Sequence, residues 1–309
     1  MSVNRREFLS AAGMAGLTFK TVAGFPILGS PGKPKIGMCD WNLGPSCDPE
    51  MIPKAREANL AGIQVSVGTS PENILLRDTK VRQRYLTLGK QYGVAFNSVA
   101  AGSILNKIPL KSEPQSAVYV IDAVETAAVL GAKNILIAFF GNGDLRLTDS
   151  TGEMRNLSKG PFKSYELDAA GVTRVVEALK QITPRAESKG VILGLENTLT
   201  ADQNLEIIDR IGSEMVQVYY DVGNSTHYGY DVPGELRKLG KNRICEIHLK
   251  DWKTPVLGSS EGEVDLKAAA AACKDIGFDQ WFVLESSGRE GRFLEDTRAN
   301  VEFAANLFG

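Results

Sequence analysis

From residue 35 onward, short apolar runs alternate with longer segments in which apolar residues recur every three or four positions. The short runs predict strands, and the longer spacing is typical of amphipathic helices. Continuous apolar runs also favour parallel strands that are buried on both faces. Eight strands are predicted, at residues 35–41, 62–67, 94–100, 134–140, 191–197, 216–222, 244–251 and 280–286.

The segments between the predicted strands have the features of helices. Residues 115–131 and 168–189 show the helical spacing of apolar residues most clearly. Several of these segments end in a glycine close to the next strand, where a helix often ends in a left-handed residue. The glycines at these positions are Gly93, Gly131, Gly190 and Gly277.

This alternation predicts an α/β fold, a single-domain (β/α)8 TIM barrel over residues 33–309. A doubly wound open sheet is the alternative, but it usually has a glycine-rich nucleotide turn after the first strand, and "DWNLGPS" at 40–46 does not supply one. Two connections, 141–166 and 252–264, are unusually long. Both follow strand C-termini, which form the catalytic face of such a barrel, so both are candidate lids.

Residues 1–32 differ from the rest of the chain and predict a signal peptide with a linker. Arg5 and Arg6 precede a weakly apolar run, and small residues ending at Ala23 suit a cleavage site. The pattern resembles a twin-arginine export signal, which implies a periplasmic protein cleaved near Ala23. The apolar run is too short to remain as a membrane span, so no stable membrane anchor is expected. The alternative is a basic amphipathic segment that stays in the cytoplasm.

Charge and cysteine content narrow the choice of partner. The chain has 35 basic and 37 acidic side chains and a net charge of −2, so no overall positive field would hold a nucleic acid. A small-molecule partner is expected instead, and a homo-oligomer is compatible with the sequence. The four cysteines show no metal-binding spacing, and Cys39 and Cys245 fall in apolar runs where buried free thiols are expected.

Groups that can bind a metal lie at the ends of the last four predicted strands: Glu196, Asp221, His248 and Glu285. An acid at a strand end is often only a helix cap, but four such groups on consecutive strands favour a shared site. Strands five to eight are neighbours in a closed barrel, so the four side chains are expected to converge at its mouth. Three carboxylates and one imidazole favour one divalent ion, Mn²⁺, Mg²⁺ or Co²⁺ rather than Zn²⁺.

The stretches around these positions resemble the sugar isomerase and epimerase family with a xylose isomerase-like barrel, of the tagatose 3-epimerase type. The likeness rests on "GLEN" at 194–197, "YYDVGNS" at 219–225, "IHLKD" at 247–251, "GEVDL" at 262–266 and "FVLES" at 282–286. It covers most of residues 35–309. The resemblance implies that Glu196, Asp221, His248 and Glu285 bind the metal. It also implies that Glu196 and Glu285 act as acid and base on opposite sides of the substrate carbon.

Other residues near the expected mouth are candidates for substrate binding. Asn224 stands where the family usually has a histidine, and it can hydrogen-bond a sugar hydroxyl but cannot act as an acid or base. Lys250 lies on the strand face of His248 by alternation, where it contacts substrate or pairs with Glu246. Glu246 itself is expected inside the barrel, where it needs a partner. The remaining candidates are His227, Trp41, Gln64 and Trp252. A loop histidine such as His227 is more often a surface residue, and ordinary packing explains the aromatic residues equally well.

These features predict a divalent-metal-dependent sugar isomerase or epimerase. Proton removal beside a carbonyl gives an enediolate, which a metal chelating the carbonyl and hydroxyl oxygens stabilises. An unphosphorylated sugar is expected, because an exported enzyme meets free sugars or glycosides. The alternatives are a lyase or hydratase of 3-keto-glycosides and a non-catalytic carbohydrate-binding barrel, which would lack one of the two glutamates. A three-zinc nuclease of the endonuclease IV type needs more than the two histidines of this chain.

Overall fold

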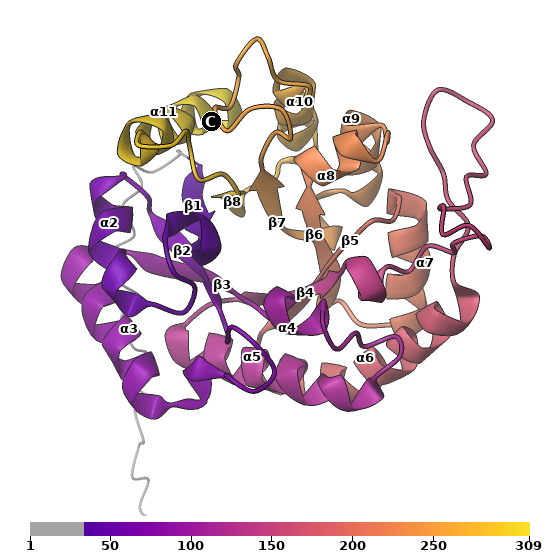
Figure 1. The fold of residues 1–309 in the computed structure, drawn as a ribbon, viewed down its shortest axis with the longest axis horizontal. Coiled ribbons are helices and arrows are strands. Elements are labelled where there is room, and N and C mark those ends of the chain that lie inside the picture. Colours follow the sequence, from indigo (N-terminus) through magenta and orange to yellow (C-terminus); the bar gives the residue numbers. More distant parts are fainter. Residues whose placement is uncertain (1–33) are drawn as a thin grey trace, which may run out of the picture.

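The computed structural model describes residues 34–309, so the predicted signal peptide at 1–32 lies outside the described residues. Eight parallel strands close into a barrel in the order β1 to β8, and β1 pairs with both β2 and β8 (Figure 1). This closure confirms the predicted (β/α)8 barrel and excludes an open sheet. The strands are β1 (Lys35–Cys39), β2 (Gly62–Ser66), β3 (Ala95–Ala100), β4 (Asn134–Phe139), β5 (Ile192–Asn197), β6 (Val216–Asp221), β7 (Ile244–Leu249) and β8 (Trp281–Leu284).

Helices surround the barrel and connect successive strands (Figure 1). Those after β3, β4 and β7 end in Gly131, Gly190 and Gly277, each in the left-handed conformation, with φ of 80°, 63° and 66°. The helices are α1 (Asp40–Leu43), α2 (Ile52–Glu57), α3 (Thr79–Tyr92), α4 (Gly102–Leu105), α5 (Ala117–Leu130), α6 (Ala169–Lys189), α7 (Ala201–Ile211), α8 (Val222–His227), α9 (Val232–Leu239), α10 (Leu266–Ile276) and α11 (Phe293–Phe308).

The core has two parts because each strand presents alternate side chains to the helices and to the barrel interior. A large apolar cluster joins the outward-facing residues, such as Ile135 and Ile137 of β4, to the helices. A smaller cluster, which includes Leu136 and Ala138, fills part of the interior. The four cysteines are buried free thiols, as predicted for Cys39 and Cys245. Polar residues occupy the rest of the interior, among them Gln64, Asn97, Ser98, Asn134, Glu246 and His248.

The segment 141–166, one of the two predicted lids, forms an arm that extends away from the barrel at the right of Figure 1. Isolated antiparallel bridges, such as Thr148 with Met154 and Asn156 with Tyr165, hold the arm together. The other segment, 252–264, is closed on itself, because the Asp251 carboxylate accepts hydrogen bonds from the backbone of Glu263 and Val264.

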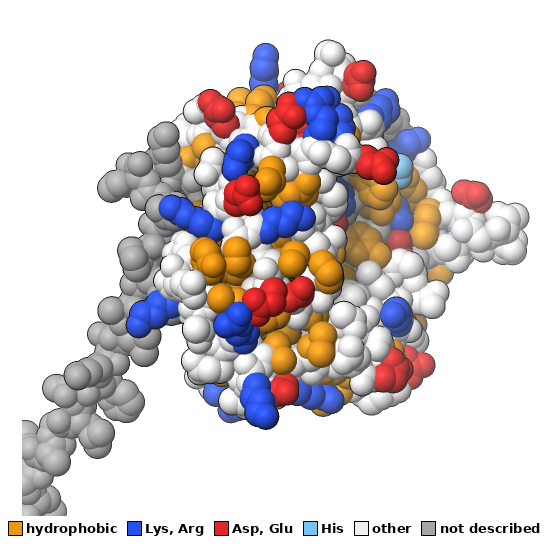
Figure 2. Space-filling model, turned by 60° about the vertical axis from the view of Figure 1, so that its left-hand side comes forward, with side chains coloured by type: hydrophobic (Ala, Val, Ile, Leu, Met, Phe, Trp, Pro, Cys, Tyr) orange, Lys and Arg blue, Asp and Glu red, His pale blue; other side chains and the backbone are white. Residues whose placement is uncertain are grey.

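The surface mixes charges of both signs. On the face drawn in Figure 2, lysine and arginine side chains are interspersed with acidic ones. Over residues 34–309, no helix combines the length and the apolar character that crossing a bilayer requires.

Candidate metal centre

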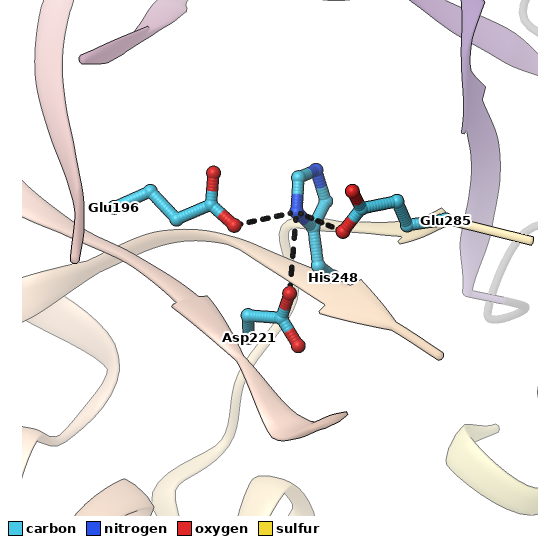
Figure 3. A group of neighbouring side chains, drawn as sticks. All are labelled: Glu196, Asp221, His248 and Glu285. Carbon is cyan, nitrogen blue, oxygen red and sulfur yellow. Dashed lines mark hydrogen bonds and ion pairs between the residues drawn. The ribbon is translucent and has the colours of Figure 1, made fainter. Parts of the chain in front are cut away.

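Four side chains from neighbouring strands point toward one another at the C-terminal mouth of the barrel (Figure 3). Each of Glu196, Asp221, His248 and Glu285 offers one ligand atom, and these atoms all lie within 4.8 Å of one another. The Nδ1 atom of His248 lies 3.1 Å from Glu196 Oε1, 3.4 Å from Glu285 Oε2 and 3.8 Å from Asp221 Oδ2. The structure thus brings together the four residues that the sequence analysis grouped.

These four side chains, called the metal-binding group below, suit a divalent cation. Glu196, Asp221 and His248 are buried, and only 20% of the Glu285 side chain is exposed. The Oδ2 atom of Asp221 accepts no hydrogen bond, although Lys250 Nζ lies 3.0 Å away. Three carboxylates this close repel one another unless a cation lies among them. Oxygen donors with one imidazole are a ligand set that divalent ions accept.

The imidazole of His248 is oriented by a contact at Nε2, the nitrogen that faces away from the carboxylates. Nε2 lies 3.1 Å from Gln64 Oε1, so Nδ1 is the nitrogen that faces the carboxylates. Burial lowers the pKa of His248, but the charges of Glu196, Glu285 and Asp221 outweigh burial and raise the pKa to about 9. At neutral pH the imidazole therefore carries a proton at the position where a metal would bind.

This proton makes metal binding dependent on pH. Because a metal must displace it from Nδ1, we expect the apparent affinity for Co²⁺ to rise about tenfold per pH unit below about pH 9, and to level off above that pH. Calorimetric titrations with Co²⁺ over a pH series, in buffers of different ionisation enthalpy, would measure both the affinity and the proton released. An affinity that stays constant between about pH 6 and about pH 8 would contradict the expectation.

Lys250 pairs with two members of the metal-binding group. Its Nζ lies 3.0 Å from Asp221 Oδ2 and 2.7 Å from Glu285 Oε2, so the alternative pairing with Glu246 is wrong. Backbone geometry makes room for this lysine at Gly223, since a Cβ atom there would lie 2.5 Å from Lys250 Cγ and 2.9 Å from its carbonyl oxygen. The glycine of "YYDVGNS" is therefore required by the close approach of Lys250.

A cavity of about 470 Å³ opens above the metal-binding group. Aromatic rings contribute to its wall, and Glu196 and Glu285 also line it. Its aromatic lining residues are Trp41, Phe140, Tyr228 and Trp252. A wall of this kind can pack against the apolar face of a sugar ring, and the polar groups at its base can bind hydroxyl groups.

The candidates for substrate binding divide into two groups. Trp41, Asn224, Lys250 and Trp252 line the cavity. Gln64 is fully buried beneath His248, and its hydrogen bonds to His248 and Ser98 replace the expected contact with substrate. His227 is exposed outside the lining and stacks against Trp252 at a centroid distance of 4.9 Å. Of the two predicted lid segments, 252–264 contributes only Trp252 to the cavity lining, and 141–166 contributes no residue to it.

The sequence analysis missed two aromatic residues of the cavity. Phe140 directly follows β4, and its position at a strand end could have identified it. Tyr228 follows α8, and its ring centroid lies 4.4 Å from Cζ of the buried Arg146 guanidinium. The same guanidinium pairs with Asp144 at 2.7 Å. No local sequence pattern links Tyr228 to Arg146, because the two residues come from different loops.

The fold and this site define a (β/α)8 barrel with a candidate metal centre at its catalytic mouth. The chain belongs to the xylose isomerase-like TIM barrel family, because its residues 52–307 match the sequence pattern of that family. The family resemblance seen in the sequence is thereby confirmed.

Three individual proteins to which the chain is similar share about a quarter of its residues or fewer. The chain is 25% identical over 281 residues to 2-epi-5-epi-valiolone 7-phosphate 2-epimerase of an Actinoplanes species, which covers 87% of this chain and 93% of that protein. It is 26% identical over 260 residues to inosose dehydratase of Geobacillus thermodenitrificans, covering 74% and 80%. Its fold is similar to that of 3-keto-D-glucoside 4-epimerase of E. coli, with a TM-score of 0.69, 15% identity, and coverage of 88% and 98%. The relatives support an enzyme of the isomerase type.

Proposed function

We propose that this protein is a divalent-metal-dependent epimerase or isomerase of an unphosphorylated sugar ketone. The observation that carries the proposal is the pair Glu196 and Glu285. Both carboxylates belong to the metal-binding group and both line the cavity, so both can reach a substrate carbon that lies between them. A non-catalytic binding protein would have no need of two such acids beside one cation site.

The residues of this chain would move the proton. A divalent ion held by Glu196, Asp221, His248 and Glu285 would supply positive charge to stabilise an enediolate. One glutamate, ionised, removes the proton beside the carbonyl, and the other, protonated, donates its own proton to the opposite face of the same carbon, so the two exchange protonation states in each turnover. Glu285 is held for this task by Lys250 at 2.7 Å and by the indole N–H of Trp41 at 3.4 Å, since each contacts a different carboxylate oxygen.

The charges around the cavity support a substrate without a phosphate group. Within the described part of the chain, Lys250 is the one cationic side chain of the cavity lining, and Asp221 and Glu285 already pair with it. Side chains that bind a phosphate are usually lysines or arginines that are free to pair with it, and the described lining offers no such cation. The proposed export by the twin-arginine route favours the same conclusion, because sugar phosphates are cytoplasmic metabolites.

Proton exchange in D₂O tests the proposal. Metal-loaded protein is incubated with keto-sugars, 3-keto-glycosides and one sugar phosphate, and NMR follows deuterium at the carbon beside the carbonyl. We expect metal-dependent deuterium incorporation with formation of an epimer or isomer, and none with the phosphate. Elimination of a β-substituent instead would support the second candidate, a lyase or hydratase, which the similarity to inosose dehydratase favours. No exchange with any ketone, in protein that binds metal, would refute both.

A further inference from the structure

Glu246 is a buried carboxylate that the proposed reaction does not use. It lies on β7, two residues before His248, and is 0% exposed. Among the described residues, no lysine or arginine forms an ion pair with it. Hydrogen-bond donors surround it instead: Tyr219 Oη at 2.5 Å, Ser98 Oγ at 2.8 Å and Asn97 Nδ2 at 2.9 Å donate to Oε2, and Asn134 Nδ2 at 3.1 Å donates to Oε1.

A chain of hydrogen bonds connects Glu246 to His248. The Ser98 hydroxyl donates to Glu246, and Ser98 Oγ accepts from Gln64 Nε2 at 3.0 Å. Because the amide nitrogen of Gln64 is directed to Ser98, its oxygen faces His248 Nε2 at 3.1 Å. A carbonyl oxygen only accepts hydrogen bonds, so Nε2 must carry a proton. When a metal displaces the second proton of the imidazole, the lone pair that becomes available is then on Nδ1, the nitrogen that faces the three carboxylates.

Tyr219 makes a second connection between the same two residues. Its hydroxyl is hydrogen-bonded to Glu246, and its ring centroid lies 4.5 Å from that of His248 with an interplanar angle of 59°. Glu246 therefore fixes one aromatic ring that packs against the imidazole, in addition to the hydrogen bond that reaches Nε2. Both contacts restrict how the imidazole can rotate.

We propose that Glu246 is a positioning residue that acts through Ser98 and Gln64 to hold the proton of His248 on Nε2 and to aim Nδ1 at the metal-binding group. The inference rests on the proposed function, because it assumes that His248 binds a metal. A carboxylate often accepts a hydrogen bond directly from a metal-binding histidine, and losing such a partner lowers metal affinity about 10-fold to 100-fold. In this protein the carboxylate reaches the histidine through two neutral side chains.

Two substitutions interrupt the chain at different points. Glu246→Gln keeps the volume but places an amide where only acceptors fit, and Gln64→Met removes the acceptor of the His248 proton. We expect each variant to bind Co²⁺ about 10-fold to 100-fold more weakly in a competition with a chelator. We also expect the ring N–H signal of His248 to move upfield in the NMR spectrum of ¹⁵N-histidine-labelled protein. The chain has two histidines, and exposed His227 exchanges its ring protons rapidly, so the protected signal belongs to His248.

Glu235→Gln is the matched control, because Glu235 is also buried but its partners are Tyr220 and the backbone of Ala201. It should change neither readout. Unchanged Co²⁺ affinity and an unchanged ring N–H signal in folded Gln64→Met would overturn the inference, and this variant keeps the test valid even if Glu246→Gln does not fold. If the unaltered protein binds no divalent ion, the proposed function fails. The ring N–H signal of metal-free protein still tests the hydrogen-bonded chain in that case.

Discussion

Replacing Glu285 by glutamine is expected to abolish epimerisation and to lower proton exchange by about 10²-fold to 10⁴-fold for the epimer whose proton faces this residue. Glutamine is similar in size and keeps an oxygen near the metal-binding group, but it cannot remove a proton. Glu196 remains, so the opposite epimer should still exchange its proton with D₂O without being converted. Glu196→Gln should show the reverse pattern. NMR of each epimer in D₂O with metal-loaded protein measures both.

The control for this prediction is Glu290→Gln, the same substitution at an exposed position five residues further along the chain. It should leave exchange and epimerisation unchanged. Metal content has to be measured for every variant, because Glu285 also belongs to the metal-binding group. Normal exchange of both epimers by a folded, metal-loaded Glu285→Gln protein would remove Glu285 from the role of base.

The barrel and its metal-binding group were predictable because both follow from periodic features of the sequence. Runs that are buried on both faces identify parallel strands, and the glycines that end helices mark where the next strand begins. Once the strands are placed, Asp221 and His248 must lie side by side, and the observed register pairs these two residues between β6 and β7. A residue at the C-terminal end of a barrel strand lies at the mouth of the barrel. Locating the ends of the last four strands therefore locates the four residues of the metal-binding group.

Residues that act through other side chains could not be predicted in this way. Gln64 was expected to touch substrate because it lies near the end of β2, yet its depth in the barrel depends on the packing of Ser98 and His248 around it. The partner of Lys250 was uncertain for a similar reason. Alternation places Lys250, His248 and Glu246 on one face of β7, but the length and flexibility of a lysine side chain decide which carboxylates it reaches.

Lys250→Met is expected to lower the free energy of unfolding of the metal-free protein by about 3–5 kcal/mol, because it leaves Asp221 and Glu285 buried without their closest cation. Added Co²⁺ should restore much of this loss, since a divalent ion among the same carboxylates replaces the missing positive charge. The variant should therefore gain more stability from Co²⁺ than the unaltered protein does. Denaturant unfolding with and without Co²⁺ measures both effects.

Lys253→Met provides the comparison, because this lysine also pairs with an acid, Glu263 at 3.2 Å, but 62% of its side chain is exposed. An exposed pair contributes at most about 1 kcal/mol, and it should not respond to Co²⁺. Equal stability of metal-free Lys250→Met and the unaltered protein would show that the three carboxylates do not need a cation. The repulsion among these carboxylates would then no longer be evidence for a bound metal at this site.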